Sequence, residues 1–167
     1  MSKQTNEKSL TRSEQMARIR ARDTGPELAL RRALHTAGLR FRLHARELPG
    51  RPDVVFRPAR VAIFVHGCFW HQHPGCGRAR VPRTRADYWL PKFARNTERD
   101  VENCESLQKA GWTVLTLWEC ESLAPILLAR FVAEVCDRVR PPAANKSEHA
   151  EVPGVPIDRF GIDAANP

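Results

Sequence analysis

The sequence has 167 residues and a formal net charge of +8, with 27 Lys and Arg against 19 Asp and Glu. This length favours one domain with a substantial core, and the charge favours a polyanionic partner, although a merely basic soluble protein is the alternative. No apolar segment is long enough to span a membrane. An odd number of cysteines and no signal-peptide pattern predict a reducing, cytoplasmic location.

The first third of the chain predicts an arm, a helix and a strand. Residues 1–13 are polar without periodicity, which predicts a flexible arm ahead of a folded domain at 14–140. Thr24 is a capping residue with Glu27 three positions later, so a helix is expected to run from there to Ala37. Residues 39–44 then alternate apolar and basic, which predicts a strand with one buried and one positive face.

Two short apolar runs, residues 53–56 and 61–65, predict an antiparallel hairpin. With Phe56 opposite Val61, Asp53 falls opposite Phe64 and beside His66. A helix is expected at 92–110, a strand parallel to its neighbour at 112–118, a helix at 122–140 and a disordered tail at 141–167. The predicted fold class is α/β, with a mixed central sheet flanked by helices.

Cysteines and a histidine follow the hairpin at metal-ligand spacing. Cys68, His73 and Cys76 lie within nine residues, and Cys120 follows the last predicted strand. Four such ligands predict a closed, tetrahedral, structural zinc site. The alternative is buried free cysteines with an incidental histidine, as Cys136 illustrates within an apolar helical stripe.

The same strand end also carries groups suited to phosphodiester cleavage. Asp53 is a candidate ligand for a hard cation, and His66 and His71 are candidates for proton transfer. Each has an alternative: Asp53 is as well explained as a turn-capping residue, His66 as a residue that orients nearby backbone, and Glu27 as a helix cap.

Four segments together resemble the very short patch repair (Vsr) DNA mismatch endonucleases. They are PGRPDVVF, VAIFVHGCFWHQH, YWLPKFARNTERD and GWTVLTLWEC, and the likeness spans about residues 14–123. The resemblance implies a fold similar to type II restriction endonucleases, and a nick in DNA on the 5′ side of the thymine in a T:G mismatch. It further implies catalytic Mg²⁺, structural Zn²⁺, duplex DNA as partner and a monomer with a possible mismatch-repair helper.

The resemblance also implies roles for individual residues. Asp53 matches the magnesium-binding aspartate, His71 the catalytic histidine, and Glu27 and His66 supporting residues of the active site. The matches to the zinc ligands are Cys68, His73, Cys76 and Cys120, and the matches to DNA contacts are Phe69, Trp70, Trp89, Lys92 and Asn96. Phe69 and Trp70 follow Gly67 in a polar loop, which favours a wedge between base pairs over core packing. The resemblance implies that Trp89, which stands in otherwise polar surroundings, wedges into the base stack with them. Trp112 and Trp118 lie within an apolar strand and are expected in the core.

Two positions depart from the expected pattern. Val65 stands where a threonine is expected, which a magnesium ligand supplied by the backbone carbonyl tolerates. Gly75 lengthens the segment before Cys76 and so affects the geometry of the zinc site. The competing functions are a restriction-like endonuclease on undamaged DNA and a zinc-stabilised DNA-binding module without activity.

Overall fold

The computed structural model describes residues 22–140. The predicted arm at 1–13, the first residues of the predicted domain and the predicted tail at 141–167 lie outside this range. The elements are α2 (Gly25–Thr36), β1 (Arg42–Leu43), β2 (Val54–Phe56), β3 (Val61–His66), the 3-10 helix η1 (Gly77–Ala79), α3 (Ala86–Lys109), β4 (Thr113–Trp118), α4 (Glu119–Ser122) and α5 (Pro125–Val139). Within the described range, no helix is both long and apolar enough to cross a membrane.

The four strands form one mixed sheet in the order β1-β2-β3-β4. β1, β2 and β3 pair in antiparallel fashion, and Phe56 pairs with Val61 in the predicted register. β4 pairs with β3 in parallel, as predicted, from Val61 opposite Thr113 to His66 opposite Trp118. The helical crossover α3 makes this parallel pairing possible, because parallel neighbours need a long connection.

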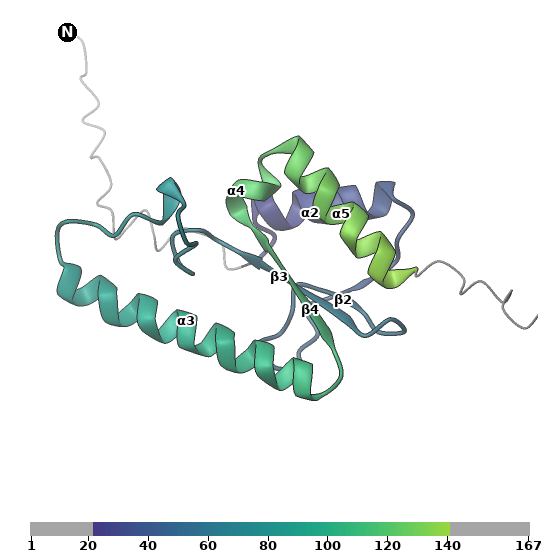
Figure 1. Cartoon of the computed structure of the whole chain (residues 1–167), viewed down its shortest axis with the longest axis horizontal. Coiled ribbons are helices and arrows are strands. Elements are labelled where there is room, and N and C mark those ends of the chain that lie inside the picture. The colour runs from purple at the N-terminus through teal and green to yellow at the C-terminus, as the bar shows by residue number, and fades with distance from the viewer. Residues whose placement is uncertain (1–21, 141–167) are drawn as a thin grey trace, which may run out of the picture.

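Helices cover both faces of the sheet, with α2, α4 and α5 on one side and α3 on the other (Figure 1). α2 carries apolar residues at helical spacing, and they pack with α5 against the inward side chains of the strands. The buried core consists of Leu30, Leu34, Leu39, Val54, Phe56, Val61, Ile63, Leu117 and Val135. This three-layer arrangement confirms the predicted α/β class with a mixed sheet flanked by helices.

Helix α2 follows the sequence signals closely. It begins after Thr24 and ends at Thr36, with Gly38 at φ +72° immediately beyond its end. A left-handed conformation at this point is open to glycine without the steric penalty of a side chain. The predicted helix from Thr24 to Ala37 is therefore confirmed.

The predicted strand at 39–44 is much shorter in the structure. Only Arg42 and Leu43 pair with β2, and the Leu43 side chain is 42% exposed. Leu39 is buried, but the expected buried face does not extend along the segment. β1 is an edge strand, and His44 at φ +49° turns the chain out of the sheet.

Two helix predictions were also wrong in their limits. α3 begins at Ala86 and contains Pro91, whereas the prediction placed its start at residue 92. Apolar packing of Trp89 and Phe93 accompanies these early turns, which offsets the backbone hydrogen bond that proline removes. The predicted helix at 122–140 corresponds to α5, which begins only at Pro125 because this proline occupies its first turn, and the short helix α4 precedes it.

Candidate active site and metal cluster

A cleft of about 1490 Å³ opens where β2 and β3 meet the loop after β3 and the middle of α3. Its lining includes the candidate residues Glu27, Asp53, Val65, His66 and His71, together with Asp100. The antiparallel hairpin places Asp53, immediately before β2, next to the end of β3, and the loop after β3 carries His71. The fold thus brings the predicted catalytic groups into one concave site.

Asp53 is held by the backbone of the neighbouring strand. Its Oδ2 accepts the N–H of Val65 at 2.8 Å, and its own N–H donates to the carbonyl of Ile63 at 3.0 Å. The carboxylate therefore bonds to the adjacent strand, not to the turn that precedes it, which disfavours the turn-capping alternative. Burial raises the pKa of Asp53 to about 6, and the nearby charge of Glu27 adds to this rise.

His66 and His71 form a stacked pair against a carboxylate of α3. Their ring centroids lie 4.0 Å apart at 8°, and Nδ1 of His71 lies 2.5 Å from Oδ2 of Asp100. Nε2 of His66 lies 4.0 Å from the other oxygen of Asp100. Burial, and then the neighbouring His71, lowers the pKa of His66 to about 4, so His66 is neutral near pH 7.

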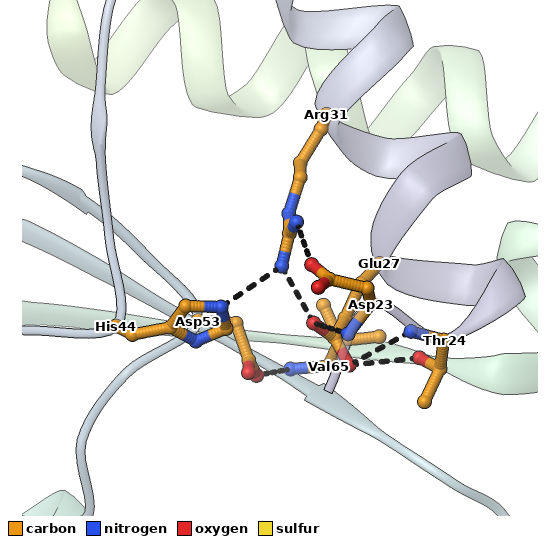
Figure 2. Close-up of polar contacts among 7 residues, drawn as sticks. All are labelled: Asp23, Thr24, Glu27, Arg31, His44, Asp53 and Val65. Atoms are coloured by element: carbon orange, nitrogen blue, oxygen red, sulfur yellow. Dashed lines mark hydrogen bonds and ion pairs between the residues drawn. The ribbon is translucent and has the colours of Figure 1, made fainter. Parts of the chain in front are cut away.

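Glu27 caps α2, as the alternative interpretation predicted. Oε1 accepts the hydroxyl of Thr24 at 2.8 Å and its N–H at 3.4 Å, while Oε2 accepts the N–H of Asp23 at 3.1 Å. Oε2 also accepts a hydrogen bond from Arg31 at 2.6 Å, as Figure 2 shows. Glu27 nevertheless lines the cleft beside Asp53, so its catalytic role stays a prediction.

Cys68, His73, Cys76 and Cys120 come together as predicted. Their candidate ligand atoms all lie within 4.8 Å of one another. Nδ1 of His73 is 3.7 Å from Sγ of Cys68 and 3.3 Å from Sγ of Cys120. A tetrahedral zinc ion with bonds of about 2.3 Å to sulfur separates its ligand atoms by roughly 3.8 Å, so the donor set fits such an ion.

Trp118 links the Cys/His cluster to the end of the sheet. Trp118, at the end of β4, stacks on His73 with centroids 4.2 Å apart and meets His66 edge-on at 5.5 Å. Trp118 was predicted to be a core residue, but it is only partly buried and lies between the cluster and the catalytic histidines. Burial raises the pKa of the Cys68 thiol to about 12, so this thiol stays protonated unless a cation binds.

Phe69 and Trp70 belong to an aromatic cluster against the first turns of α3. The Phe69 ring lies 5.1 Å from that of Trp70, 5.5 Å from that of Trp89 and 5.1 Å from that of Phe93. Phe69 and Trp70 are partly exposed and line the cleft, whereas Trp89 is only 9% exposed. The expectation that Trp89 stands in polar surroundings is therefore wrong, because α3 begins early enough to place it one turn from Phe93.

Lys92 and Asn96 project from α3 toward this aromatic cluster. Nζ of Lys92 lies 4.9 Å from the ring centroid of Trp70, within cation–π range, and 5.6 Å from that of Tyr88. The side-chain amide of Asn96 donates to the carbonyl of Trp70 at 3.1 Å. Both residues thus hold the loop that carries Trp70, and their predicted contact with DNA stays a prediction.

Sequence reasoning assigned no role to three residues that the structure places at these sites. Asp100 orients His71, Arg31 binds Glu27, and Glu119 accepts the N–H of Cys68 at 3.2 Å. For Asp100 a signal was present, since it shares a helical spacing with Lys92 and Asn96. For Arg31 a signal was also present, because it lies four residues after Glu27, a helical ion-pair spacing that Arg32 lacks, but the sequence did not indicate that this pair is buried.

A family model and several related proteins match this chain, and they agree on its family. A family model described as DNA mismatch endonuclease Vsr matches residues 5–77. The DNA mismatch endonuclease Vsr of Escherichia coli is 48% identical over 110 residues, which cover 66% of this chain and 70% of that protein. The Type II nicking enzyme V.XorIIP of Xanthomonas oryzae is 48% identical over 106 residues, covering 64% and 77% respectively.

A further relative extends the match along most of its own length. The Type II nicking enzyme V.NmeAIP of Neisseria meningitidis is 36% identical over 132 residues, which cover 77% of this chain and 94% of that protein. The residues that carry the resemblance also meet in one cleft, as described above. On this evidence the chain belongs to the Vsr family of DNA mismatch endonucleases.

Proposed function

We propose that this DNA mismatch endonuclease nicks one strand of duplex DNA on the 5′ side of the thymine in a T:G mismatch. Family membership supports the endonuclease activity. The single observation that carries the chemistry is the meeting of Asp53 with the His71–Asp100 pair in one cleft. A DNA-binding module without activity has no need of a partly buried carboxylate and an oriented imidazole in one cleft.

The proposed metal site is centred on Asp53. Its Oδ2 is engaged by Val65, and the remaining oxygen, together with the backbone carbonyl of Val65, would hold Mg²⁺ with water and phosphate as further ligands. Carboxylate and carbonyl oxygens are the ligands that such a hard cation prefers. When bound, Mg²⁺ neutralises phosphate charge and favours attack by water.

His71 is the proposed proton-transfer residue. Its Nδ1 is taken by Asp100, which leaves Nε2 as the nitrogen available to the cleft. Asp100 stabilises the protonated form of this imidazole once it has accepted a proton. His66 supports the ring of His71 by stacking, and its neutral state avoids a second positive charge against it.

DNA recognition is proposed to use the cluster of Phe69 and Trp70. Both line the same cleft as the catalytic groups, where an apolar side chain can enter a base step that a wobble pair has weakened. Trp89, which was also expected to insert, is buried behind them and supports their position. The positive charge of the chain supplies attraction to phosphate that is independent of sequence.

The remaining expectations belong to the same proposal. The Cys/His cluster is proposed to bind one structural Zn²⁺, and the sheet with its flanking helices to have the type II restriction endonuclease-like core. One chain carries all the proposed catalytic groups for one nick, which supports action as a monomer. The proposed location is the reducing cytoplasm. A mismatch-repair helper protein stays a prediction.

The decisive experiment compares labelled duplexes that differ only in T:G versus C:G, with and without Mg²⁺. We expect a single nick 5′ to the mismatched thymine, only on T:G and only with the cation. Cleavage of both duplexes would support the restriction-like alternative. Binding without any cleavage would support the inactive DNA-binding module.

A further inference from the structure

Arg31 is a buried cation for which the proposed mechanism has no role so far. It lies in the middle of α2 and is only 9% exposed. Its Nη1 contacts Oδ1 of Asp23 at 2.5 Å, and its Nη2 contacts Oε2 of Glu27 at 2.6 Å and Nε2 of His44 at 3.3 Å. Figure 2 shows the guanidinium among these three groups, with Asp53 and Val65 beside them.

Stability alone is a weak reason for this arrangement. Transfer of a guanidinium and a carboxylate out of water carries a large desolvation penalty. The attraction between the two buried charges often does no more than offset this penalty. The Nε atom of Arg31 is buried without a hydrogen-bond partner in the described structure, which adds to the penalty. Apolar side chains in place of the whole ion pair would often be as stable or more stable.

The position of the Arg31–Glu27 ion pair next to the cleft suggests that Arg31 is buried for a role in the active site. Glu27 and Asp53 line the same cleft, so two carboxylates face one site. Neighbouring carboxylates repel each other, so a nearby opposite charge helps to keep the Glu27 side chain in place. Arg31 lies against Glu27 on the side of α2 and supplies the opposite charge.

The contacts also fix where the Glu27 carboxylate points. Oε1 is bonded to Thr24 and Oε2 to both Asp23 and Arg31. The contacts of Glu27 with Thr24 and Asp23 lie at the N-terminal end of α2, where Asp23 is exposed. Arg31 is one turn further along the helix and buried, so it is the rigid member of the set.

We propose that Arg31 is a positioning residue for the nicking reaction, which acts through Glu27 by holding its carboxylate fixed beside Asp53. Arg31 is not among the residues that line the cleft, so it is expected to act without touching the reacting phosphate. This inference rests on the proposed function, since it assigns Arg31 to the same active site. It also separates Arg31 from the arginines that contribute only to the overall attraction for DNA.

The test is a double-mutant cycle in single-turnover nicking of a T:G duplex with saturating full-length protein and Mg²⁺. The variants are Arg31→Met, Glu27→Gln and the two combined. We expect Arg31→Met to lower the rate about 10–100-fold, the range for residues that orient active-site ligands, with DNA affinity changed less than about twofold. The combined variant should be no slower than Glu27→Gln alone, because Arg31 acts through that carboxylate.

Arg32 provides the matched control, because Arg32→Met makes the same change of charge on an exposed neighbour of α2. It should nick at nearly the wild-type rate. If Arg31→Met does not fold, Arg31→Lys takes its place in the cycle, because it keeps the charge, and a partial loss of rate is expected. Thermal unfolding of each variant establishes which of them are folded.

Two outcomes overturn the inference: a folded Arg31 variant that nicks at the wild-type rate, or losses that multiply in the combined variant. The second outcome would mean that Arg31 and Glu27 act independently. Wild-type protein that does not nick T:G duplexes would instead refute the proposed function, and the role of Arg31 would fall with it. Activity of the wild-type protein therefore distinguishes the two failures.

Discussion

The Nδ1 atom of His71 lies 2.5 Å from Oδ2 of Asp100, although the two residues belong to different elements. This contact fixes which ring nitrogen of His71 carries a proton when the imidazole is neutral. We predict that Asp100→Asn lowers the nicking rate by about 10²–10⁴, the range for general acid–base catalysis. Single-turnover rates measure this effect, and DNA binding measured in parallel should be unchanged. A wild-type rate in the folded variant would exclude a role for Asp100 in orienting His71.

Replacement of Asp53 by asparagine separates catalysis from binding. Asp53→Asn keeps an oxygen that can accept the N–H of Val65, but it removes the charge that would hold Mg²⁺. We expect nicking to be abolished, while affinity for the mismatch stays equal or rises slightly because a negative charge no longer faces phosphate. Gel-shift and nicking assays on the same duplex test both parts. Robust Mg²⁺-dependent nicking by this variant would falsify the metal-ligand assignment.

Although Asp53→Asn is expected to abolish nicking, we expect it to stabilise the fold of the metal-free protein. Burial raises the pKa of Asp53 to about 6 from 3.8, so the folded state binds a proton more tightly than the unfolded state does. Ionised Asp53 therefore destabilises the fold at high pH, and this penalty fades as pH falls through 6 and is absent below about 4. We expect Asp53→Asn to stabilise the metal-free protein by about 2 kcal/mol at pH 8 and hardly at all at pH 4. Urea unfolding at the two pH values, without divalent cations, checks the sign.

The Cys/His cluster predicts a bound metal that stabilises the fold. We expect about one zinc per chain in protein purified without added metal, as determined by elemental analysis. Cys76→Ser should lower the free energy of unfolding by at least about 2 kcal/mol, because loss of a ligand removes folding free energy tied to the metal. Cys136→Ser is the control, since that thiol packs against the apolar core. A fully folded protein that contains no zinc contradicts the prediction.

Trp70 is the side chain best placed to probe a mismatch. We predict that Trp70→Ala lowers the preference for T:G over C:G duplexes about tenfold, with a smaller effect on affinity for random duplex, which depends on contacts with phosphate. Trp112→Ala is the control, because Trp112 precedes β4 and is not among the residues that line the cleft. Competition binding at fixed salt measures both quantities. Equal losses on matched and mismatched DNA would assign Trp70 a structural role only.

Local signals in the sequence were sufficient for much of the fold. The cap at Thr24 and the glycine at 38 predicted α2, and two apolar runs predicted the hairpin with its register. The metal-ligand spacing likewise predicted the group that includes Cys68 and Cys120. In these cases the determining interactions lie within a few residues or follow from a fixed chemical requirement.

The residues that sequence reasoning missed depend on tertiary contacts. Asp100 acquires a role only because α3 folds back against the loop that carries His71. The spacing of Glu27 and Arg31 allows an ion pair along the helix, but an arginine within a helix is usually exposed, so nothing local indicated that the pair is buried. Trp89 was misplaced because the start of α3 was predicted too late, which hid its neighbour Phe93.

Because β3 pairs in parallel with β4, the sheet is completed only late in the synthesis of a new chain. Val61 pairs with Thr113 on the far side of α3, so contacts of this kind form late and close a long loop. During synthesis, the hairpin and its carboxylate leave the ribosome well before β4 and Cys120 do. An incomplete chain therefore holds Asp53 without the strand that completes the sheet and without the last ligand of the Cys/His cluster. A nuclease built in this way does not acquire its cleft until the whole domain has been made.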